Sequence, residues 1–311
     1  MVGFLSLDDV DTDELHKIVG RSATVLDQPD PLEKRLSGKV LGVYFAKTST
    51  RTRTAFSTAA LRLGASIVQY GPGDLQLNTG ESLHDTGRMF GAMLDGLVMR
   101  TAGPLEDMRV VARSGGLPVV NAMAAQEHPT QGVCDAAAML RHFGRVDGLS
   151  VLYVGEGNNT AVALGKILST YRDVTVVFAT PKGYGLDAAL LDSLREKGAE
   201  SGTRFVETHD LDTVDITADV VYTTRWQTTG TAKPSADWRE DFRPFHVDDE
   251  VMARWPEAVF MHDLPAHRGD EVKGSVLDGD RSIAWEQARM KYGSAVAILE
   301  WIYRDSGQSA R

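Results

Sequence analysis

Short apolar runs alternate with amphipathic segments along most of the chain. Apolar runs rich in Val, Leu and Ile are typical of strands that are buried on both faces of a sheet. In the first half of the chain this pattern predicts strands at residues 40–45, 65–70, 96–100 and 118–123. In the second half it predicts strands at residues 151–154, 174–178, 204–207, 219–223 and 258–262.

Between these strands, apolar residues recur at a spacing of three and four positions, which predicts helices. The predicted helices cover residues 11–26, 55–63, 160–170, 187–197, 248–254 and 284–303, one more starts near residue 81, and another ends near residue 143. Strands that alternate with helices favour a parallel, doubly wound sheet. We therefore predict an α/β fold.

Length and composition place limits on the class of protein. A chain of 311 residues is long enough for two domains of ~150 residues, and the glycines and charges at 144–149 mark the expected connection. The net charge of −10 argues against binding to nucleic acid or to an anionic membrane. The single cysteine, Cys134, excludes an internal disulfide and a cysteine-based metal cluster, and we expect it to be buried.

Membrane insertion and export are not expected. No apolar run approaches the ~20 residues that a membrane-spanning helix needs. The N-terminus lacks the basic flank and the apolar segment of a signal peptide. We therefore expect a soluble, cytoplasmic protein.

Residues 45–54 carry the strongest chemical signal in the chain. They follow the strand at 40–45 and lead into the helix at 55–63, and they contain two arginines and five Ser or Thr residues. The N–H groups at a helix N-terminus attract anions, and an arginine adds a bidentate fork. Ser49, Thr50, Arg51 and Thr52 can together surround a phosphate. The alternative is a polar loop before a solvated helix start, which explains the density of donors less well.

Two further polar groups follow predicted strands. Arg100 ends the strand at 96–100, and the stretch His128-Pro129-Thr130-Gln131 follows the strand at 118–123. Ligands of doubly wound sheets collect at the carboxyl ends of the strands. We therefore expect the anion loop, Arg100 and His128 to share one site.

The stretch Ser49-Thr50-Arg51-Thr52-Arg53, after a strand that ends in Phe45, resembles the carbamoyl-phosphate loop of the aspartate/ornithine carbamoyltransferase family. The stretch at 128–131 matches the second signature of that family, and the resemblance extends over essentially the whole chain. It implies two doubly wound domains with a final helix that returns to the first. The expected divisions are 1–145 for carbamoyl phosphate, 146–283 for the amine substrate, and 284–311 for the returning helix.

The resemblance also implies roles for residues of the first site. Ser49, Thr50 and Arg51 would hold the phosphate, and Gln131 would hold the amino group of carbamoyl phosphate. The groups that would stabilise the carbonyl oxygen during the reaction are Thr52, Arg100, His128 and Arg289. No metal, cofactor or covalent intermediate is implied.

Gln76 matches a position at which ornithine-type members place a phosphate-contacting glutamine in the site of a neighbouring subunit. A homotrimer, or a multiple of trimers, follows from this resemblance. A solvated loop residue is the alternative for Gln76, and both interpretations remain open. Aspartate-type members carry a lysine where this chain has Thr79, which counts against an aspartate carbamoyltransferase.

The stretch Gly155-Glu156-Gly157-Asn158-Asn159 follows a predicted strand and opens a helix. A dinucleotide-binding fingerprint needs a third glycine where this chain has Thr160, so nucleotide binding is not favoured. Ornithine-type members have a similar Gly-Asp-Gly-Asn-Asn stretch, in which an asparagine contacts the amino-acid substrate. The resemblance transfers this role to Asn159, with Asn158 as the alternative.

Residues 224–230 depart from the ornithine-type pattern Asp-x-Trp-x-Ser-Met-Gly, in which the Asp and the Ser bind the α-amino group of the substrate. Thr224 replaces the Asp, and Thr228 replaces the Ser. Aspartate-type members have a similar Thr-Arg-x-Gln stretch, whose Arg and Gln hold a substrate carboxylate. Arg225 and Gln227 therefore either bind a carboxylate, or Arg225 points into solvent.

The stretch His262-Asp263-Leu264-Pro265 departs from the ornithine-type His-Cys-Leu-Pro. A carboxylate at Asp263 favours a cationic group of the substrate, and a desolvated carboxylate can accept a proton from the attacking ammonium. The alternative is an internal pair of Asp263 with Arg268 or another arginine. By resemblance, the backbone carbonyl of Leu264 orients the attacking amine.

The sequence thus predicts an enzyme of the ornithine-type branch, which transfers the carbamoyl group of carbamoyl phosphate to an amine of an amino-acid-like substrate. The products would be a ureido compound and phosphate. Because Thr224 and Asp263 alter the amine-binding motifs, we expect an amine other than plain L-ornithine. The alternatives are a true ornithine carbamoyltransferase, an aspartate-type enzyme and a non-catalytic structural homologue. No nucleic-acid or membrane partner is expected.

Overall fold

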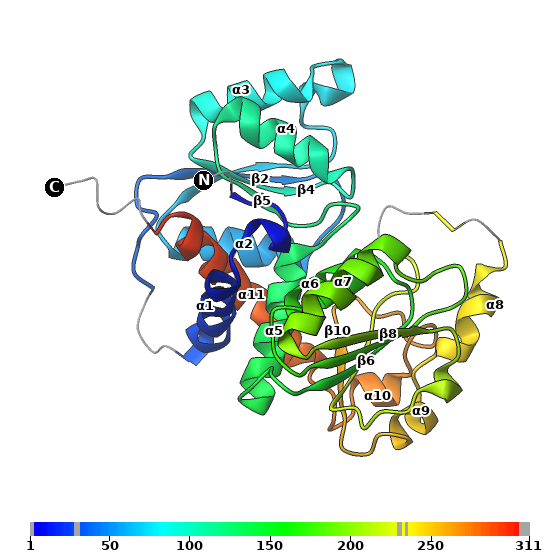
Figure 1. Ribbon diagram of the computed structural model, residues 1–311. Coiled ribbons are helices and arrows are strands. Elements are labelled where there is room, and N and C mark those ends of the chain that lie inside the picture. Colours follow the sequence, from blue (N-terminus) through cyan, green and yellow to red (C-terminus); the bar gives the residue numbers. More distant parts are fainter. Residues whose placement is uncertain (1–2, 28–31, 229–231, 234–235, 305–311) are drawn as a thin grey trace. The chain divides into compact units, whose positions relative to one another are not determined.

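The computed structural model describes residues 3–27, 32–228, 232–233 and 236–304. It divides into two compact units, unit 1 (Met1–Ala137 with Met290–Arg311) and unit 2 (Ala138–Arg289). The chain passes from unit 1 to unit 2 within helix α5 (Pro129–Phe143) and returns within helix α11 (Ala284–Ile302) (Figure 1). Each unit holds a five-stranded parallel sheet, which confirms the predicted α/β fold class. The division at 145 and 283 into a carbamoyl-phosphate-binding domain, an amine-binding domain and a returning helix stays a prediction.

Unit 1 is built on the sheet β1-β5-β4-β2-β3, whose strands are all parallel. The strands are β1 (Gly3–Phe4), β2 (Val40–Phe45), β3 (Ser66–Tyr70), β4 (Gly96–Arg100) and β5 (Val119–Asn121). The helices are α1 (Thr12–Thr24), α2 (Arg51–Arg62), α3 (Leu83–Met93) and α4 (Leu105–Gly115). Figure 1 shows α3 and α4 on one face of this sheet and α1 and α2 on the other. All residues of the central strand β4 are buried, whereas the edge strand β3 is partly exposed.

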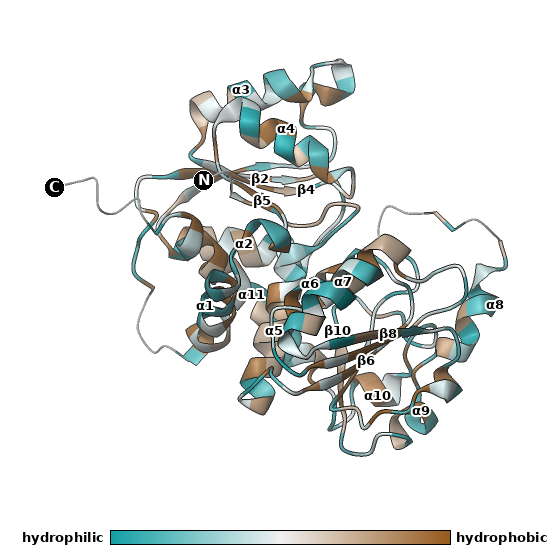
Figure 2. Ribbon diagram, in the orientation of Figure 1, coloured by the Kyte–Doolittle hydropathy of each residue, from teal (hydrophilic) through white to brown (hydrophobic). Residues whose placement is uncertain are grey.

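Unit 2 is built on the parallel sheet β10-β9-β6-β7-β8. The strands are β6 (Ser150–Val154), β7 (Thr175–Ala179), β8 (Arg204–Thr208), β9 (Val220–Thr223) and β10 (Val259–His262). The helices are α6 (Asn159–Leu168), α7 (Ala188–Ser201), α8 (Trp238–Phe242), α9 (Asp249–Ala253) and α10 (Gly274–Leu277). Figure 2 shows β6 as hydrophobic, because Leu152 and its neighbours belong to the core. That core also holds Val221 and Val177 from β9 and β7, the two strands beside β6, and Phe260 from β10.

Each sheet has one point at which the strand order reverses. In unit 1 this point lies between β2 and β4, where Phe45 pairs with Arg100. In unit 2 it lies between β6 and β9, where Val154 pairs with Thr223. In doubly wound sheets, the crevice at such a point is where ligands bind. The anion loop follows β2 at the first of these points, and the stretch at 155–159 follows β6 at the second.

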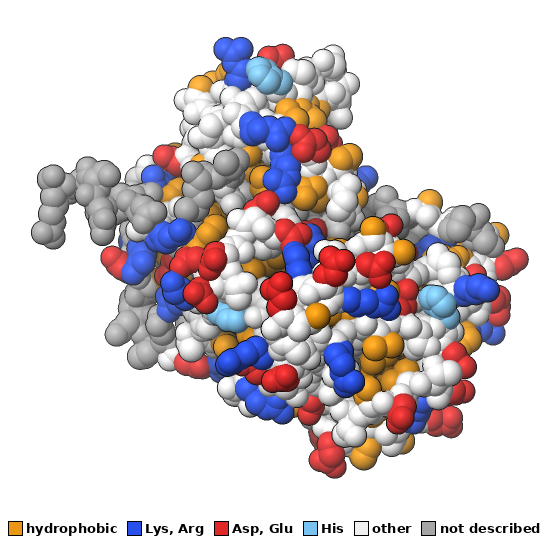
Figure 3. All heavy atoms as spheres, in the orientation of Figure 1, with side chains coloured by type: hydrophobic (Ala, Val, Ile, Leu, Met, Phe, Trp, Pro, Cys, Tyr) orange, Lys and Arg blue, Asp and Glu red, His pale blue; other side chains and the backbone are white. Residues whose placement is uncertain are grey.

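The charged side chains are mixed on the molecular surface. The chain has 33 Lys and Arg against 43 Asp and Glu, and Figure 3 shows both kinds interspersed on the face that it presents. In the part of the chain that the structure describes, no helix has the length and apolar character needed to cross a membrane. Cys134 is buried, as predicted.

Candidate active site

The anion loop of unit 1 leads directly into the first turn of α2. This helix begins at Arg51, and its cap residue Thr50 makes no capping hydrogen bond through its side chain to the described residues. Thr52 is buried, whereas Ser49 and Arg51 are partly exposed. The first-turn N–H groups of a helix have no partner within the helix, so they are suited to bind an anion.

The two arginines of the loop have different surroundings. Arg53 donates from Nη2 to Oε1 of Gln69, on the edge strand β3, over 2.6 Å. Residues two apart on a helix do not share a face. Arg53 is therefore directed to β3, whereas Arg51 is the first residue of α2 and lies at its N-terminus.

Arg100 and His128 form a buried pair at the carboxyl edge of the unit 1 sheet. Arg100 Nη1 lies 3.4 Å from His128 Nε2, and Thr130 Oγ1 lies 3.2 Å from His128 Nδ1. Because an arginine can only donate, Nε2 accepts in this arrangement and Nδ1 carries the proton. The ring can take the other tautomer as well, since the Thr130 hydroxyl can donate to Nδ1. Nε2 can then donate to a carbonyl oxygen.

His128 is held in its neutral form. Burial lowers the pKa of His128 well below its usual range, and the positive charges of Arg100 and Lys291 lower it further. A neutral imidazole between cations can act as a hydrogen-bond donor to an oxygen, but it is a poor site for an added proton.

Gln131 lies in a second buried network of unit 1. Its Nε2 donates to Asp135 Oδ1 over 2.6 Å, and its Oε1 accepts from Nζ of Lys291 on α11. All three side chains are buried. A carbonyl oxygen has two lone pairs, so Oε1 keeps the capacity to accept from a ligand N–H group.

Two further residues predicted for carbamoyl phosphate, Gln76 and Arg289, are exposed. Gln76 is exposed in the short helix Gln76–Thr79, where its Oε1 accepts from Thr79 Oγ1 over 2.8 Å. Arg289 is an exposed residue of α11 and belongs to unit 2. For both residues, a role at the carbamoyl group stays a prediction.

In unit 2, two neighbouring asparagines in the turn between β6 and α6 have different positions in the structure. Asn158 caps α6, because its side chain accepts from the N–H groups of Thr160 and Ala161 over 2.9 and 3.2 Å. Asn159 is the first residue of the helix and is buried. The turn depends on Gly157, where an added Cβ would lie only 2.4 Å from the carbonyl carbon of Gly185.

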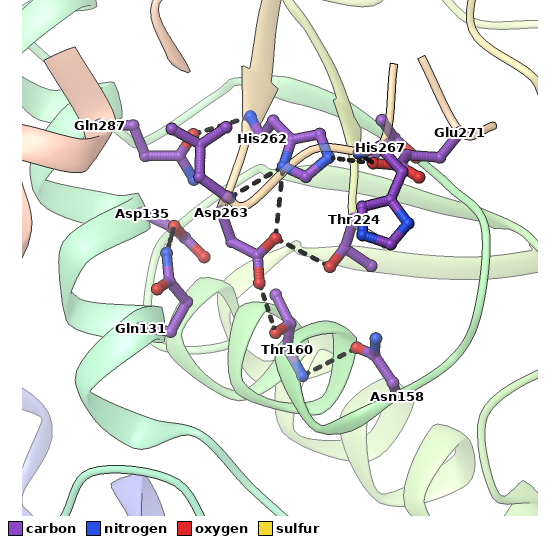
Figure 4. Close-up of polar contacts among 12 residues, drawn as sticks. Gln131, Asp135, Asn158, Thr160, Thr224, His262, Asp263, His267, Glu271 and Gln287 are labelled. Atoms are coloured by element: carbon purple, nitrogen blue, oxygen red, sulfur yellow. Dashed lines mark hydrogen bonds and ion pairs between the residues drawn. The ribbon is translucent and has the colours of Figure 1, made fainter. Parts of the chain in front are cut away.

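A hydroxyl-bonded carboxylate lies at the ends of β9 and β10. Thr224 Oγ1 donates to Asp263 Oδ1 over 2.8 Å, and Thr160 Oγ1 donates to Oδ2 over 3.1 Å (Figure 4). Thr160 and Thr224 are buried, and the Asp263 side chain is 16% exposed. The predicted alternative, a pair of Asp263 with Arg268, does not form, because Arg268 bonds Asp278 instead over 2.9 Å.

A buried histidine lies beside this carboxylate, with His262 Nδ1 3.5 Å from Asp263 Oδ1. His262 Nδ1 accepts from the N–H of Leu264 over 2.8 Å, so the ring proton is on Nε2, which lies 3.1 Å from Glu271 Oε1. The N–H of His262 donates to Gln287 Oε1 over 2.8 Å. Leu264 adopts a left-handed φ of 52°, a strained conformation for a leucine that typically occurs at functional sites. Figure 4 shows these groups around Asp263.

Residues 225–228 continue from β9 as a loop. Arg225 is partly buried, and its Nε is buried without a hydrogen-bond partner among the described residues. A buried and unsatisfied donor weighs against an arginine that simply points into solvent. Gln227 and Thr228 are partly exposed, and Thr228 Oγ1 donates to Glu156 Oε2 over 3.3 Å. Thr229 and Gly230, from the same stretch, lie outside the described residues.

The structure adds residues that the sequence analysis did not select. Lys291 and Asp135 hold Gln131, and Glu271 holds His262. Thr160 received attention only as the residue in place of a third glycine. Nothing in the local sequence distinguishes these residues. The role of each follows from its hydrogen-bond partner, which is either distant in the chain or one helical turn away in a helix without a recognisable motif. Among the described residues, no group of His, Cys, Asp and Glu is arranged to hold a metal ion.

These features define a class of protein. It has two parallel α/β units, each with polar ligand groups at the point where the strand order reverses. Unit 1 offers an anion-binding helix N-terminus beside an arginine–histidine pair, and unit 2 offers a hydroxyl-bonded carboxylate. Such an arrangement fits a transferase whose substrates are an anion and an amine.

Comparisons with known proteins agree with this class. Residues 3–141 match the family model for the carbamoyl-P binding domain of aspartate/ornithine carbamoyltransferase, and residues 147–302 match the model for its Asp/Orn binding domain. The ornithine carbamoyltransferase of Thermococcus kodakarensis is 36% identical over 265 residues, which cover 85% of this chain and 84% of the relative. That of Symbiobacterium thermophilum is 36% identical over 308 residues, covering 96% and 97%.

Solved structures give the same result. The structure of ornithine carbamoyltransferase from Pyrococcus furiosus matches with a TM-score of 0.89 at 32% identity and covers 97% of each chain. That from Gloeobacter violaceus matches with a TM-score of 0.85 at 30% identity, covering 97% of this chain and 98% of the other. The chain belongs to the aspartate/ornithine carbamoyltransferase family, and it is a carbamoyltransferase. Because these relatives are ornithine carbamoyltransferases, the comparisons favour the predicted alternative, ornithine, over the expectation of a different amine.

Proposed function

We propose that this chain transfers the carbamoyl group of carbamoyl phosphate to the side-chain amine of L-ornithine, which gives citrulline and phosphate. The observation that carries the proposal is the nearly full-length similarity to ornithine carbamoyltransferases, with Symbiobacterium thermophilum as an example. The two sets of ligand groups in units 1 and 2 provide the chemistry that the reaction needs.

In this reaction a neutral amine attacks the carbonyl carbon of carbamoyl phosphate. The bond from that carbon to the phosphate oxygen breaks, phosphate leaves, and the nitrogen loses a proton. Negative charge grows on the carbonyl oxygen, and fixed donors aimed at this oxygen give the largest single contribution to such a catalyst. We assign this role to Thr52, Arg100 and His128, with Arg289 as a further donor.

The leaving phosphate needs its own ligands. We assign Ser49, Thr50 and Arg51 to the phosphate, since they lie at the N-terminus of α2. Gln131 would accept from the carbamoyl amino group through the second lone pair of Oε1. Gln76 would contact the phosphate in the site of a neighbouring subunit.

The amine substrate would bind to unit 2. Asp263 offers a carboxylate to an ammonium group, and Thr160 and Thr224 hold both of its oxygens. The backbone carbonyl of Leu264 would orient the attacking nitrogen. Asn159, Arg225, Gln227 and Thr228 are the proposed ligands for the α-amino and carboxylate ends of the substrate.

A second candidate is a different diamino acid, and one observation favours it. The pattern for ornithine-type members places an Asp where this chain has Thr224 and a Cys where it has Asp263. The carboxylate of this chain therefore lies at a different position from that of the ornithine-type pattern. A shorter or differently charged amine would fit a binding site with the carboxylate at Asp263.

We also propose that the subunits assemble as a homotrimer, as is typical of the family. Several large apolar side chains of unit 1 are exposed and would be covered by such assembly, namely Leu61, Val68, Met89 and Met93. Analytical ultracentrifugation tests this assignment. A monomer at micromolar concentration would contradict it.

The function is tested by phosphate release from carbamoyl phosphate across a panel of amines. The panel contains ornithine, lysine, aspartate, putrescine, 2,3-diaminopropionate and N-acylated diamines, and an Arg51→Ala variant measures the background. Turnover with ornithine that exceeds every other amine in kcat/KM supports the proposal. Turnover with 2,3-diaminopropionate but not with ornithine would instead establish the second candidate. Phosphate release at the background rate with every amine would contradict both.

A further inference from the structure

Lys233 of unit 2 is enclosed by aromatic rings. Its Nζ lies 4.9 Å from the ring centroid of Tyr184, 5.4 Å from that of Trp238 and 4.7 Å from that of Phe242. Its side chain is only 3% exposed, and Nζ forms an ion pair with Glu156. We call these four surrounding residues, Tyr184, Trp238, Phe242 and Glu156, the cage.

The cage has the chemistry of a receptor for an alkylammonium ion. Ring faces attract a cation within about 6 Å, and the attraction grows when water is excluded. The rings are arranged edge to face, with Tyr184 and Trp238 at centroid distances of 4.8 and 5.4 Å from Phe242. The carboxylate of Glu156 supplies a full opposing charge. Burial lowers the pKa of Lys233, and the hydrogen bond and charge of Glu156 oppose this shift.

The cage connects two segments that carry proposed amine ligands. Glu156 lies in the turn before α6, two residues before the cap Asn158. Its second carboxylate oxygen accepts from Thr228 on the loop that follows β9. Lys233 comes five residues after Thr228 in the chain. Lys233 bonds one carboxylate oxygen of Glu156, and Thr228 bonds the other.

The same loop also contains Trp226, which packs with Trp238 and Phe242 in one apolar cluster. Trp226 comes immediately after Arg225 and before Gln227. A lysine held in the cage therefore limits the freedom of Arg225, Gln227 and Thr228 at one end, while β9 limits it at the other. Ligand groups that are ordered before binding lose less entropy on binding.

We propose that Lys233 is a positioning residue for the amine substrate. It acts as a built-in alkylammonium ligand of the cage and thereby fixes the loop that carries Arg225, Gln227 and Thr228. The expected effect on the KM for the amine rests on the proposed function. The binding of the Lys233 ammonium group in the cage does not depend on which reaction the enzyme catalyses.

The kinetic test compares Lys233→Met, which keeps the length of the side chain but removes its charge, with Lys182→Met as a matched control at an exposed lysine of unit 2. We expect Lys233→Met to raise the KM for the amine about tenfold. This is the size of effect expected when a cation–π contact that is shielded from water is lost. The KM for carbamoyl phosphate should stay within about twofold of that of the control. An unchanged KM for the amine, or an equal rise in both KM values, would overturn the positioning role.

A binding test separates failure of this inference from failure of the proposed function. A Lys233→Ala variant is titrated with tetramethylammonium, a cation that cannot be carbamoylated, and the fluorescence of the tryptophans is recorded. We expect saturable binding to Lys233→Ala, none to the wild type, and loss of binding in the Lys233→Ala, Glu156→Gln double variant. Hydrogen exchange of peptides within 224–228 should be faster in Lys233→Met than in Lys182→Met. No saturable binding to Lys233→Ala, or unchanged exchange, would overturn the inference whatever amine is the substrate.

Discussion

Thr224 Oγ1 donates a 2.8 Å hydrogen bond to Asp263 Oδ1, across the ends of two neighbouring strands. Thr223 pairs with His262 in the register of β9 and β10, so the next residue on each strand, 224 and 263, must be adjacent. The ornithine-type pattern has a carboxylate at the first of these positions, and this chain has it at the second. Both patterns therefore have one carboxylate at this pair of neighbouring positions, and in this chain it follows β10 instead of β9. This relationship makes the altered motifs compatible with a substrate that carries an ammonium group.

The first prediction concerns this carboxylate. Asp263→Asn keeps the shape of the side chain and removes its charge, so we expect kcat/KM for the amine to fall about 100-fold, since one partner of a buried charge pair is worth about 2–5 kcal/mol. The KM for carbamoyl phosphate should not change. Thr224→Ser, which preserves the hydroxyl donor, is the matched control and should retain activity. Steady-state kinetics with each substrate varied in turn provide the measurement, and a fully active Asp263→Asn enzyme would exclude this carboxylate from amine binding.

The second prediction separates the two arginines of the anion loop. Arg51→Ala should reduce kcat roughly 100- to 1,000-fold, the range for one donor lost from an oxyanion or phosphate site. Arg53 bonds Gln69 on β3, so Arg53→Ala should leave activity within about threefold of the wild type. Circular dichroism on both variants controls for folding. Similar losses in both variants would contradict the assignment of Arg51 as the phosphate ligand.

Much of the fold could be predicted from local pattern. The strand at 40–45 agrees with β2 at both ends, because its apolar run is continuous and is followed by polar residues. The helix expected at 55–63 begins earlier, at Arg51, because its first turn is polar and gives no apolar periodicity. Helix α4 was not predicted at all. Its buried residues Met108, Val111 and Ala112 stand at the i, i+3, i+4 spacing of an amphipathic helix, so the pattern that predicts this helix is present in the sequence.

The candidate site was only partly predictable for a related reason. Residues that end strands, such as Arg100, follow from the rule for parallel sheets. The contacts that orient them depend on long-range packing, as in the bond from Lys291 to Gln131, which are 160 positions apart. Such a contact leaves no local signal in a single sequence. The same holds for Glu271, whose role depends on the buried ring of His262.

The third prediction concerns the effect of pH on stability through His128. Burial and the nearby cations lower the pKa of His128 in the folded protein well below the value of about 6.5 that it has when unfolded. Between these two pKa values the unfolded state binds more protons, so the free energy of unfolding decreases as the pH falls below about 6.5. Urea unfolding at pH 7.5, 6.5 and 5.5 should show this loss in the wild type.

A variant that lacks only His128 isolates the contribution of this residue. In His128→Asn the decrease between pH 6.5 and 5.5 should be smaller than in the wild type. His84→Asn, at an exposed position of α3, is the matched control and should retain the slope of the wild type. Identical slopes in all three proteins would show that His128 does not titrate differently in the folded and unfolded states.

The fourth prediction distinguishes the two asparagines at the start of α6. Asn158 accepts from the N–H groups of Thr160 and Ala161, so Asn158→Ala should lower the free energy of unfolding by about 1 kcal/mol, the usual effect of losing a helix cap. Asn159 is the first helical residue and is the proposed substrate ligand. Asn159→Ala should therefore raise the KM for the amine about tenfold, the typical effect of one hydrogen bond to a charged group.

The pair of variants is informative because the two effects should dissociate. Thermal unfolding should show a Tm lowered by a few degrees for Asn158→Ala, in the range of about 2–4 °C for a unit of this size, and a smaller shift for Asn159→Ala. Kinetics should show the opposite ranking for the amine KM. If Asn158→Ala instead raises the amine KM while the Tm is unchanged, the cap geometry is not maintained when substrate binds, and Asn158 is the ligand. The distinction matters because the cap and the cage meet in this turn, where Glu156, two residues before Asn158, bonds Lys233.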